Sequence, residues 1–150
     1  MRPDAPRGHA RLTGGSRRLA RVKPMTHDSD IEYVPGKPGL PFSTAVRVGS
    51  VLYLSGQLGT RPDGSLPEDF VEQARQTMEN IARALADVGS SMDRVFKATV
   101  MLADMSRWAE FNAVYLEYFD ADRLPARSAF GAAGLALGAH MEVEVWAYAP

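Results

Sequence analysis

The chain has 150 residues, of which 45% are hydrophobic and 23% are charged, which predicts one soluble domain with a sizeable buried core. It contains no cysteine, which excludes disulfides, thiolate metal sites and a cysteine nucleophile. The same absence fits a reducing compartment, so we expect a cytoplasmic protein. No apolar run approaches the roughly 18–20 residues that a membrane-spanning helix needs.

The charge is unevenly distributed along the chain. Residues 1–24 contain seven Lys/Arg and one Asp, a net charge of +6, whereas residues 25–150 contain ten Lys/Arg and seventeen Asp/Glu, a net charge of −7. The first segment has few large apolar residues, which predicts a basic disordered extension. A true start at Met25 and an Arg-rich transit peptide are alternative interpretations. The acidic remainder argues against nucleic-acid binding by the domain.

The first half of the chain predicts two strands and a helix. Residues 25–40 are expected to form an irregular lead-in, because proline and glycine punctuate residues 35–41. Strands are predicted over 45–48 and 51–55, with Gly49-Ser50 as a two-residue hairpin turn. Between residues 67 and 88 apolar residues recur at spacings of three and four, which indicates an amphipathic helix that ends before Gly89.

The second half alternates strand and helix. Residues 95–102 form a β-branched and aromatic run that predicts a strand covered on both faces. Ser106 can cap a second helix, and strands are predicted over 126–132 and 140–148. Helical spacing places the aromatic residues of the second helix in the core: Trp108, Phe111, Tyr115, Tyr118 and Phe119.

This order, β-β-α-β-α-β-β, predicts an α+β fold with a mixed sheet of about six strands. Only two helices are available, and they can cover only one face of the sheet. An apolar sheet face does not remain in water, so we expect other copies of the chain to cover the second face. That face is predicted to carry Tyr53, Ser55, Met101, Trp146 and Tyr148.

Two charged residues interrupt strands that otherwise have core composition. Arg127 follows Pro125 at the start of one strand, and Glu142 lies inside the last strand. A charge embedded in a strand is costly unless it is paired or functional. One hypothesis is that Arg127 binds a substrate carboxylate and Glu142 transfers a proton. The alternative is a salt bridge between the two side chains at a subunit interface.

Several short motifs over residues 41–148 occur in a characteristic order. They are Pro41-Phe42, Leu54-Ser55-Gly56-Gln57, residues 73–80 of the first helix, Phe111-Asn112-Ala113-Val114-Tyr115, Pro125-Ala126-Arg127-Ser128 and Met141-Glu142-Val143-Glu144. In this order and spacing, residues 41–150 resemble a domain of the RidA/YjgF family, the reactive intermediate deaminases. The resemblance implies a chorismate-mutase-like fold and a homotrimer with a site in each of three inter-subunit clefts.

The same resemblance implies an activity, namely hydrolysis of 2-aminoacrylate and related enamines or imines to 2-keto acids and ammonia. Arg127 matches the family arginine that binds the substrate carboxylate, and Glu142 matches the acid that activates water. No cofactor or metal is expected, because the substrate is already reactive. The expected binding partner is a small imino or enamino acid, and no binding to nucleic acid or to a membrane is expected. The remaining predicted substrate-binding residues are Phe42, Ser55, Gly56, Asn112, Ser128 and Ala129.

The sequence departs from the usual family pattern at two of these positions. Phe42 stands where tyrosine is common, and Ala129 where cysteine is common. The Gly134–Gly138 loop is also smaller and more apolar than usual, so these changes concern the preference for a substrate side chain. The alternative function is a non-catalytic trimer that binds small carboxylates or a protein partner in the same clefts. A ribonuclease is a third choice, which the acidic domain disfavours.

Overall fold

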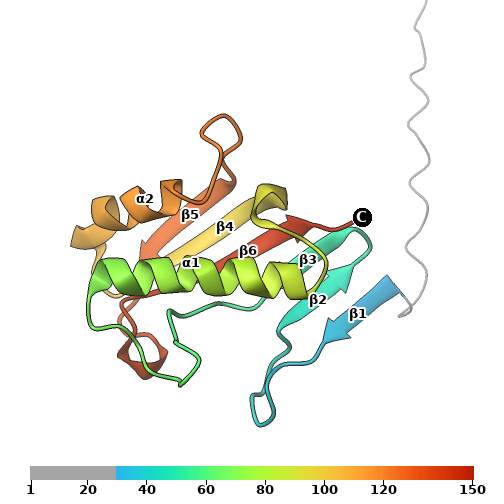
Figure 1. The fold of residues 1–150 in the computed structure, drawn as a ribbon, viewed down its shortest axis with the longest axis horizontal. Helices are drawn as coiled ribbons and strands as arrows, with labels where there is room; N and C mark the ends of the chain where they lie inside the picture. Colours follow the sequence, from blue (N-terminus) through green and yellow to red (C-terminus); the bar gives the residue numbers. More distant parts are fainter. Residues whose placement is uncertain (1–29) are drawn as a thin grey trace, which may run out of the picture.

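The computed structural model describes residues 30–150, so the predicted extension over residues 1–24 lies outside the described residues. It shows a six-stranded sheet with the order β1-β2-β3-β6-β4-β5. Only β4 and β5 are parallel, and both helices lie on one face of the sheet (Figure 1). The predicted α+β fold with a mixed sheet is therefore confirmed. The strands are Ile31–Val34 (β1), Ala45–Val48 (β2), Val51–Leu54 (β3), Val95–Leu102 (β4), Ala126–Gly131 (β5) and Met141–Tyr148 (β6).

Strand β1 corrects the expectation that residues 25–40 are irregular throughout. Ile31–Val34 pairs with β2 in antiparallel register at the edge of the sheet. Three of its four side chains are exposed, and Tyr33 is 66% exposed. The sequence Ile-Glu-Tyr-Val suits a strand, but a run of four residues beside the proline and glycine of residues 35–41 is too short to separate from an irregular segment.

The predicted hairpin is confirmed as β2 and β3. Gly49 adopts a φ of 58° in the turn, a conformation that a residue without a side chain adopts without strain. Strand β3 buries alternate residues, Leu52 and Leu54, whereas β2 buries only Ala45. The hairpin therefore delivers the chain to Ser55 and Gly56 at the end of β3.

Helix α1 spans Phe70–Asp87, within the predicted range. The Asp69 carboxylate accepts a hydrogen bond from the backbone N–H of Glu72 at 2.9 Å, which caps the first turn. One side of the helix packs against the sheet, and its buried apolar residues follow the predicted spacing: Phe70, Ala74, Met78, Ile81 and Leu85.

A buried glutamine ties α1 to the start of β6. Gln73 is 2% exposed, and its side-chain amide donates to the carbonyl oxygen of Pro67 at 2.7 Å. Its amide oxygen accepts from the backbone N–H of His140 at 2.6 Å. Both polar ends of the side chain are therefore satisfied, and the segment that leads into Glu142 is fixed to the helix layer.

Helix α2 spans Trp108–Leu116 and follows a 3₁₀ turn over Met105–Arg107. The cap of this segment is Asp104, not the predicted Ser106, because the Asp104 carboxylate accepts from the backbone N–H of Ser106 at 2.9 Å. Tyr115 is buried as expected, but Trp108 is 43% exposed, so its assignment to the core was wrong.

Strand β6 divides its side chains cleanly between the two faces of the sheet. Met141, Val143, Val145 and Ala147 are fully buried beneath the helices, as the alternation predicted. The residues between them face the other side, where the rings of Trp146 and Tyr53 lie 5.0 Å apart. That second face carries neither helix (Figure 1). Within residues 30–150, no helix is long and apolar enough to cross a membrane.

Candidate functional site

Arg127 lies on the edge strand β5 and faces the helix layer. Its register partner on β4 is Ala98, which is in turn paired with Val145 on β6, and both partners are fully buried. The Arg127 Cζ atom is 4.6 Å from the centroid of the Tyr115 ring and 5.8 Å from that of Trp108. The guanidinium group is therefore held between the sheet edge and α2.

The side of α2 that meets Arg127 carries three residues at helical spacing. Trp108, Asn112 and Tyr115 follow one another at intervals of four and three, so they lie on one stripe of the helix. The Asn112 Oδ1 atom and the Tyr115 hydroxyl are buried, and neither has a hydrogen-bond partner within residues 30–150. Burial raises the pKa of the Tyr115 hydroxyl, and the positive charge of Arg127 opposes part of that rise.

The guanidinium of Arg127 is half-buried but makes no side-chain hydrogen bond or ion pair in the described part of the chain. Some other arginines are occupied, for example Arg107, whose fork binds Glu110 at 2.6 and 2.8 Å. The arginines that are unpaired like Arg127 within residues 30–150 are exposed, unlike Arg127: Arg83, Arg94 and Arg123. A partly desolvated guanidinium with unused donors is suited to an anionic ligand, and a carboxylate matches its planar fork.

Glu142 lies on the opposite face of the sheet from Arg127. It pairs in register with Met101 and alternates with the buried Met141 and Val143. Its carboxylate packs directly over Gly56, where a Cβ atom would overlap it. The next residue, Gln57, exchanges two backbone hydrogen bonds with Val143, at 2.8 and 3.0 Å, which fixes Gly56 beside the start of β6.

We expect the variant Gly56→Ala to displace the Glu142 carboxylate and to lower any activity that depends on it about 10-fold or more, since misplacement of a reacting group by about 1 Å can cost up to 100-fold. Gly56 has no positive φ, so alanine fits the backbone and only the Glu142 side chain must move. Turnover assays and thermal unfolding measure the two effects. Gly134→Ala is the matched control, because a Cβ there meets nothing within 4 Å. Equal activity of both variants would contradict this arrangement.

The other predicted site residues divide between these two locations. Ala129 shares the face of Arg127, because it pairs with the buried Val100. Ser128 faces the other side, where its hydroxyl accepts from Lys97 Nζ at 3.0 Å.

Near Gly56, the Ser55 hydroxyl donates to the carbonyl oxygen of Ser43 at 2.6 Å. The Ser55 hydroxyl is therefore engaged in a hydrogen bond within the hairpin region. Phe42 lies in the loop before β2 and is 52% exposed.

A single copy of the chain therefore does not assemble the predicted site. Arg127 and Asn112 lie at the helix side of the β5 edge, whereas Gly56 and Glu142 lie at the open face beside the start of β6. Among the described residues, the alternative salt bridge between Arg127 and Glu142 is not formed within one copy. Within one copy, the sheet separates the two charges.

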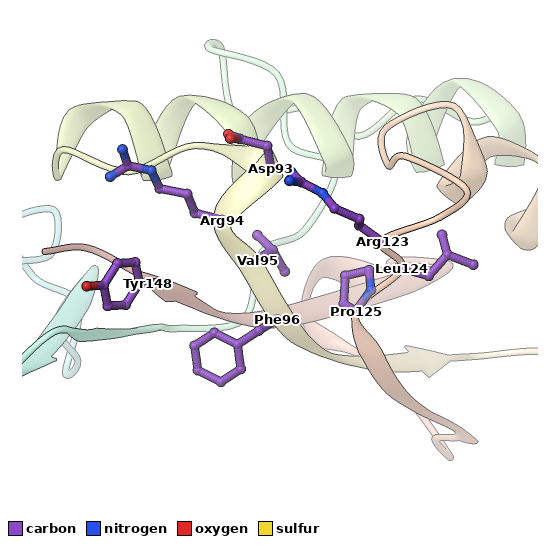
Figure 2. Close-up of a pocket in the computed structure, with 8 residues that line it drawn as sticks. All are labelled: Asp93, Arg94, Val95, Phe96, Arg123, Leu124, Pro125 and Tyr148. Carbon is purple, nitrogen blue, oxygen red and sulfur yellow. The ribbon is translucent and has the colours of Figure 1, made fainter.

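A pocket of about 460 Å³ lies elsewhere, where β4 and β5 begin and β6 ends (Figure 2). Two arginines and two aromatic rings surround it, and none of the predicted site residues lines it. The pocket therefore does not bring Arg127 and Glu142 together. Its lining residues are Asp93, Arg94, Val95, Phe96, Arg123, Leu124, Pro125 and Tyr148.

Comparison with known proteins agrees with the fold and with the motifs. Residues 36–149 match the family described as Endoribonuclease L-PSP. The 2-iminobutanoate/2-iminopropanoate deaminase of Mus musculus is 39% identical over 106 residues, which cover 69% of this chain and 78% of the mouse protein. The chain belongs to the RidA/YjgF family.

Two further proteins are similar to this chain. Protein HMF1 of Saccharomyces cerevisiae is 42% identical over 104 residues, which cover 69% of this chain and 80% of the yeast protein. The crystal structure of E. coli TdcF with bound serine superposes with a TM-score of 0.69 at 30% identity, covering 79% of this chain and 94% of TdcF. The fold is thus shared over nearly the whole length of TdcF.

In this RidA/YjgF chain, sequence reasoning missed the two aromatic neighbours of Arg127. Trp108 and Tyr115 were assigned to the core, because their helical spacing is what a core helix requires. The signal that could have found them is Asn112 between them, since a polar residue on the same stripe does not fit an apolar core.

Proposed function

We propose that this protein hydrolyses reactive enamine and imine intermediates of the 2-aminoacrylate type to 2-keto acids and ammonia. The observation that carries the proposal is the Arg127 guanidinium, which is half-buried, held against Tyr115 and unpaired within residues 30–150. It is supported by the mammalian family members that are named 2-iminobutanoate/2-iminopropanoate deaminases.

In this proposal, Arg127 binds the substrate carboxylate. A 2-imino acid is planar, with its carboxylate beside an electrophilic C=N carbon. Two parallel N–H···O bonds from the guanidinium fix both the position and the plane of the carboxylate, which a lysine ammonium cannot do. Fixing that plane presents one face of the imine carbon to water, which removes much of the entropic barrier to attack.

In this proposal, the Glu142 carboxylate accepts and donates the protons of the reaction. Its carboxylate accepts a proton as water adds to the imine carbon and forms a C–O bond. The same proton is then returned to the nitrogen, which gives a carbinolamine. The carboxylate next accepts the proton of the new hydroxyl and passes it to the nitrogen, so that the carbonyl of the 2-keto acid forms, the C–N bond breaks and ammonia leaves with both water protons. Atoms and charge balance with water as the only co-reactant, so no cofactor or metal is required.

We further propose that each site is shared between copies of a homotrimer, with Arg127 of one copy facing Glu142 and Gly56 of the next. Two observations support sharing. The two charges lie on opposite faces within one chain, and the open face exposes apolar rings, including Tyr53 at 36% and Tyr148 at 49%. Covering that face with other copies removes the rings from water and brings the edge strand of one copy to the sheet of its neighbour.

The proposal is tested by generating an imine in solution with an amino-acid oxidase and measuring release of keto acid and ammonia. We expect the purified protein to raise the rate above the spontaneous one in proportion to its concentration, whereas heat-denatured protein does not. No acceleration with several different amino acids would contradict the deaminase assignment.

The alternative is a non-catalytic trimer that binds small carboxylates or a protein partner in the same clefts. The observation that favours it is that the carboxylate-binding group is formed by Arg127 against Tyr115 within one copy, so that binding does not require Glu142. Binding of a 2-keto acid without any rate acceleration would favour this function. The family description as an endoribonuclease has less support, because RNA binding depends on positive surface charge and residues 25–150 carry a net charge of −7.

A further inference from the structure

The aromatic residues of α2 form a surface against which Arg127 rests. Tyr115 is 3% exposed and its ring lies 4.6 Å from the guanidinium carbon, while Trp108, about two helical turns earlier, lies at 5.8 Å. Both rings are on the stripe that faces β5. They are the contacts that hold the end of the Arg127 side chain within residues 30–150, since no hydrogen bond or ion pair does so there.

Ring faces attract a guanidinium group through the ring quadrupole and also limit how it can rotate. An arginine side chain has many rotamers, and restricting them before a ligand arrives lowers the entropy that binding must remove. A guanidinium restricted by two neighbouring rings therefore presents its planar set of N–H donors in fewer orientations than a free side chain does.

We propose that Tyr115, assisted by Trp108, is a positioning residue that sets the plane of the Arg127 fork for a small 2-keto or 2-imino acid. The inference rests on the proposed function insofar as Arg127 binds the substrate carboxylate. The ring of Tyr115 performs this role and its hydroxyl does not, because the hydroxyl is buried without a partner in the described part of the chain.

The first test is the dissociation constant of 2-oxobutanoate, measured by calorimetry on the full-length protein. We expect Tyr115→Phe to bind within twofold of wild type, because the ring remains. Tyr115→Leu, which is smaller and apolar and has no ring face, is expected to bind about 10-fold more weakly, and Trp108→Leu about threefold more weakly. Phe119→Leu is the matched control, since Phe119 packs on Tyr115 at 4.6 Å between ring centroids but is not in contact with Arg127.

The second test is the NMR signal of the Arg127 Nε–H group in the free protein, assigned by its loss in Arg127→Lys. In wild type and Tyr115→Phe we expect a ring-current shift, and in Tyr115→Leu a signal near the value of an exposed arginine. The ¹⁵N relaxation of the same Nε–H group reports rotamer freedom and not the ring current, and we expect a more mobile guanidinium in Tyr115→Leu, which a purely structural role of Tyr115 would not produce. Thermal unfolding of each variant shows whether it folds, and Trp108→Leu changes an exposed residue and so keeps the test available if Tyr115→Leu unfolds.

The outcomes separate this inference from the proposed function. If wild type binds 2-oxobutanoate and Tyr115→Leu binds it equally well, the positioning role is wrong while the carboxylate site stands. If Tyr115→Phe is as weak as Tyr115→Leu, the hydroxyl and not the ring is responsible, which also overturns the inference. If wild type binds no 2-keto acid, the proposed function fails, and an unchanged Arg127 signal in Tyr115→Leu overturns the positioning role independently.

Discussion

Replacing Arg127 with alanine is expected to lower kcat/KM for imine hydrolysis by about 100-fold or more. Removing one partner of a buried, hydrogen-bonded charge pair costs about 2–5 kcal/mol, and each ~1.4 kcal/mol corresponds to a factor of ten in rate. Arg127→Lys restores the charge but not the planar pair of donors, so we expect it to recover only part of the loss.

Arg123→Ala is the matched control for this prediction. Arg123 lies four residues earlier, is exposed and lines the pocket at the start of β5 without contacting any predicted site residue in the described structure. We expect its activity to stay within twofold of wild type. Thermal unfolding of both variants separates lost activity from lost stability. If Arg127→Ala keeps more than half of the wild-type rate, the carboxylate role assigned to Arg127 is wrong.

Mixed oligomers of Arg127→Ala and Glu142→Gln are expected to recover about a quarter of wild-type activity, although each variant alone is inactive. In a cyclic trimer with shared sites, every mixed trimer contains one site in which a wild-type Arg127 meets a wild-type Glu142 of its neighbour. Random equal mixing makes about three quarters of the trimers mixed, and one of the three sites in each is intact. Refolding the two variants together and assaying imine hydrolysis measures the recovery.

Refolding each variant with a tagged copy of itself provides the control and should restore nothing. No recovery in verified mixed trimers would show that both residues of a site come from the same copy, or that the two residues do not share a site.

The activity of Glu142→Gln alone tests the proton-transfer role of Glu142. If Glu142→Gln by itself is as active as wild type, Glu142 does not transfer the proton, and the shared site must use another base.

Much of the fold follows from local patterns in the sequence. The apolar spacing from Phe70 to Leu85 and the alternation from Met141 to Ala147 predict a helix and a strand because each period matches one backbone geometry. Strand β1 escaped prediction because Ile31–Val34 is only four residues long, which is too short a run for its period to be distinguished.

The candidate site was only partly accessible to the same reasoning. Arg127 and Glu142 stood out because a charge inside a strand of core composition requires an explanation. Whether the two side chains lie on the same face of the sheet could not be predicted. That depends on the register in which the strands pair, and the pattern of one strand does not show which residues of its neighbours face the same side. Tyr115 was hidden because a residue that packs against an arginine and one that packs in a core have the same helical spacing.

By itself, therefore, the sequence determined the helices, the hairpin, the open apolar face and the two unusual charges, because each depends on side chains close together along the chain. Only the tertiary structure decided that Arg127 lies under α2 against Tyr115, and that Glu142 lies over Gly56 on the other side of the sheet. The physical reason is that the parallel pairing of β4 with β5 and the antiparallel pairing of β4 with β6 fix these faces, and both pairings join residues far apart in the sequence.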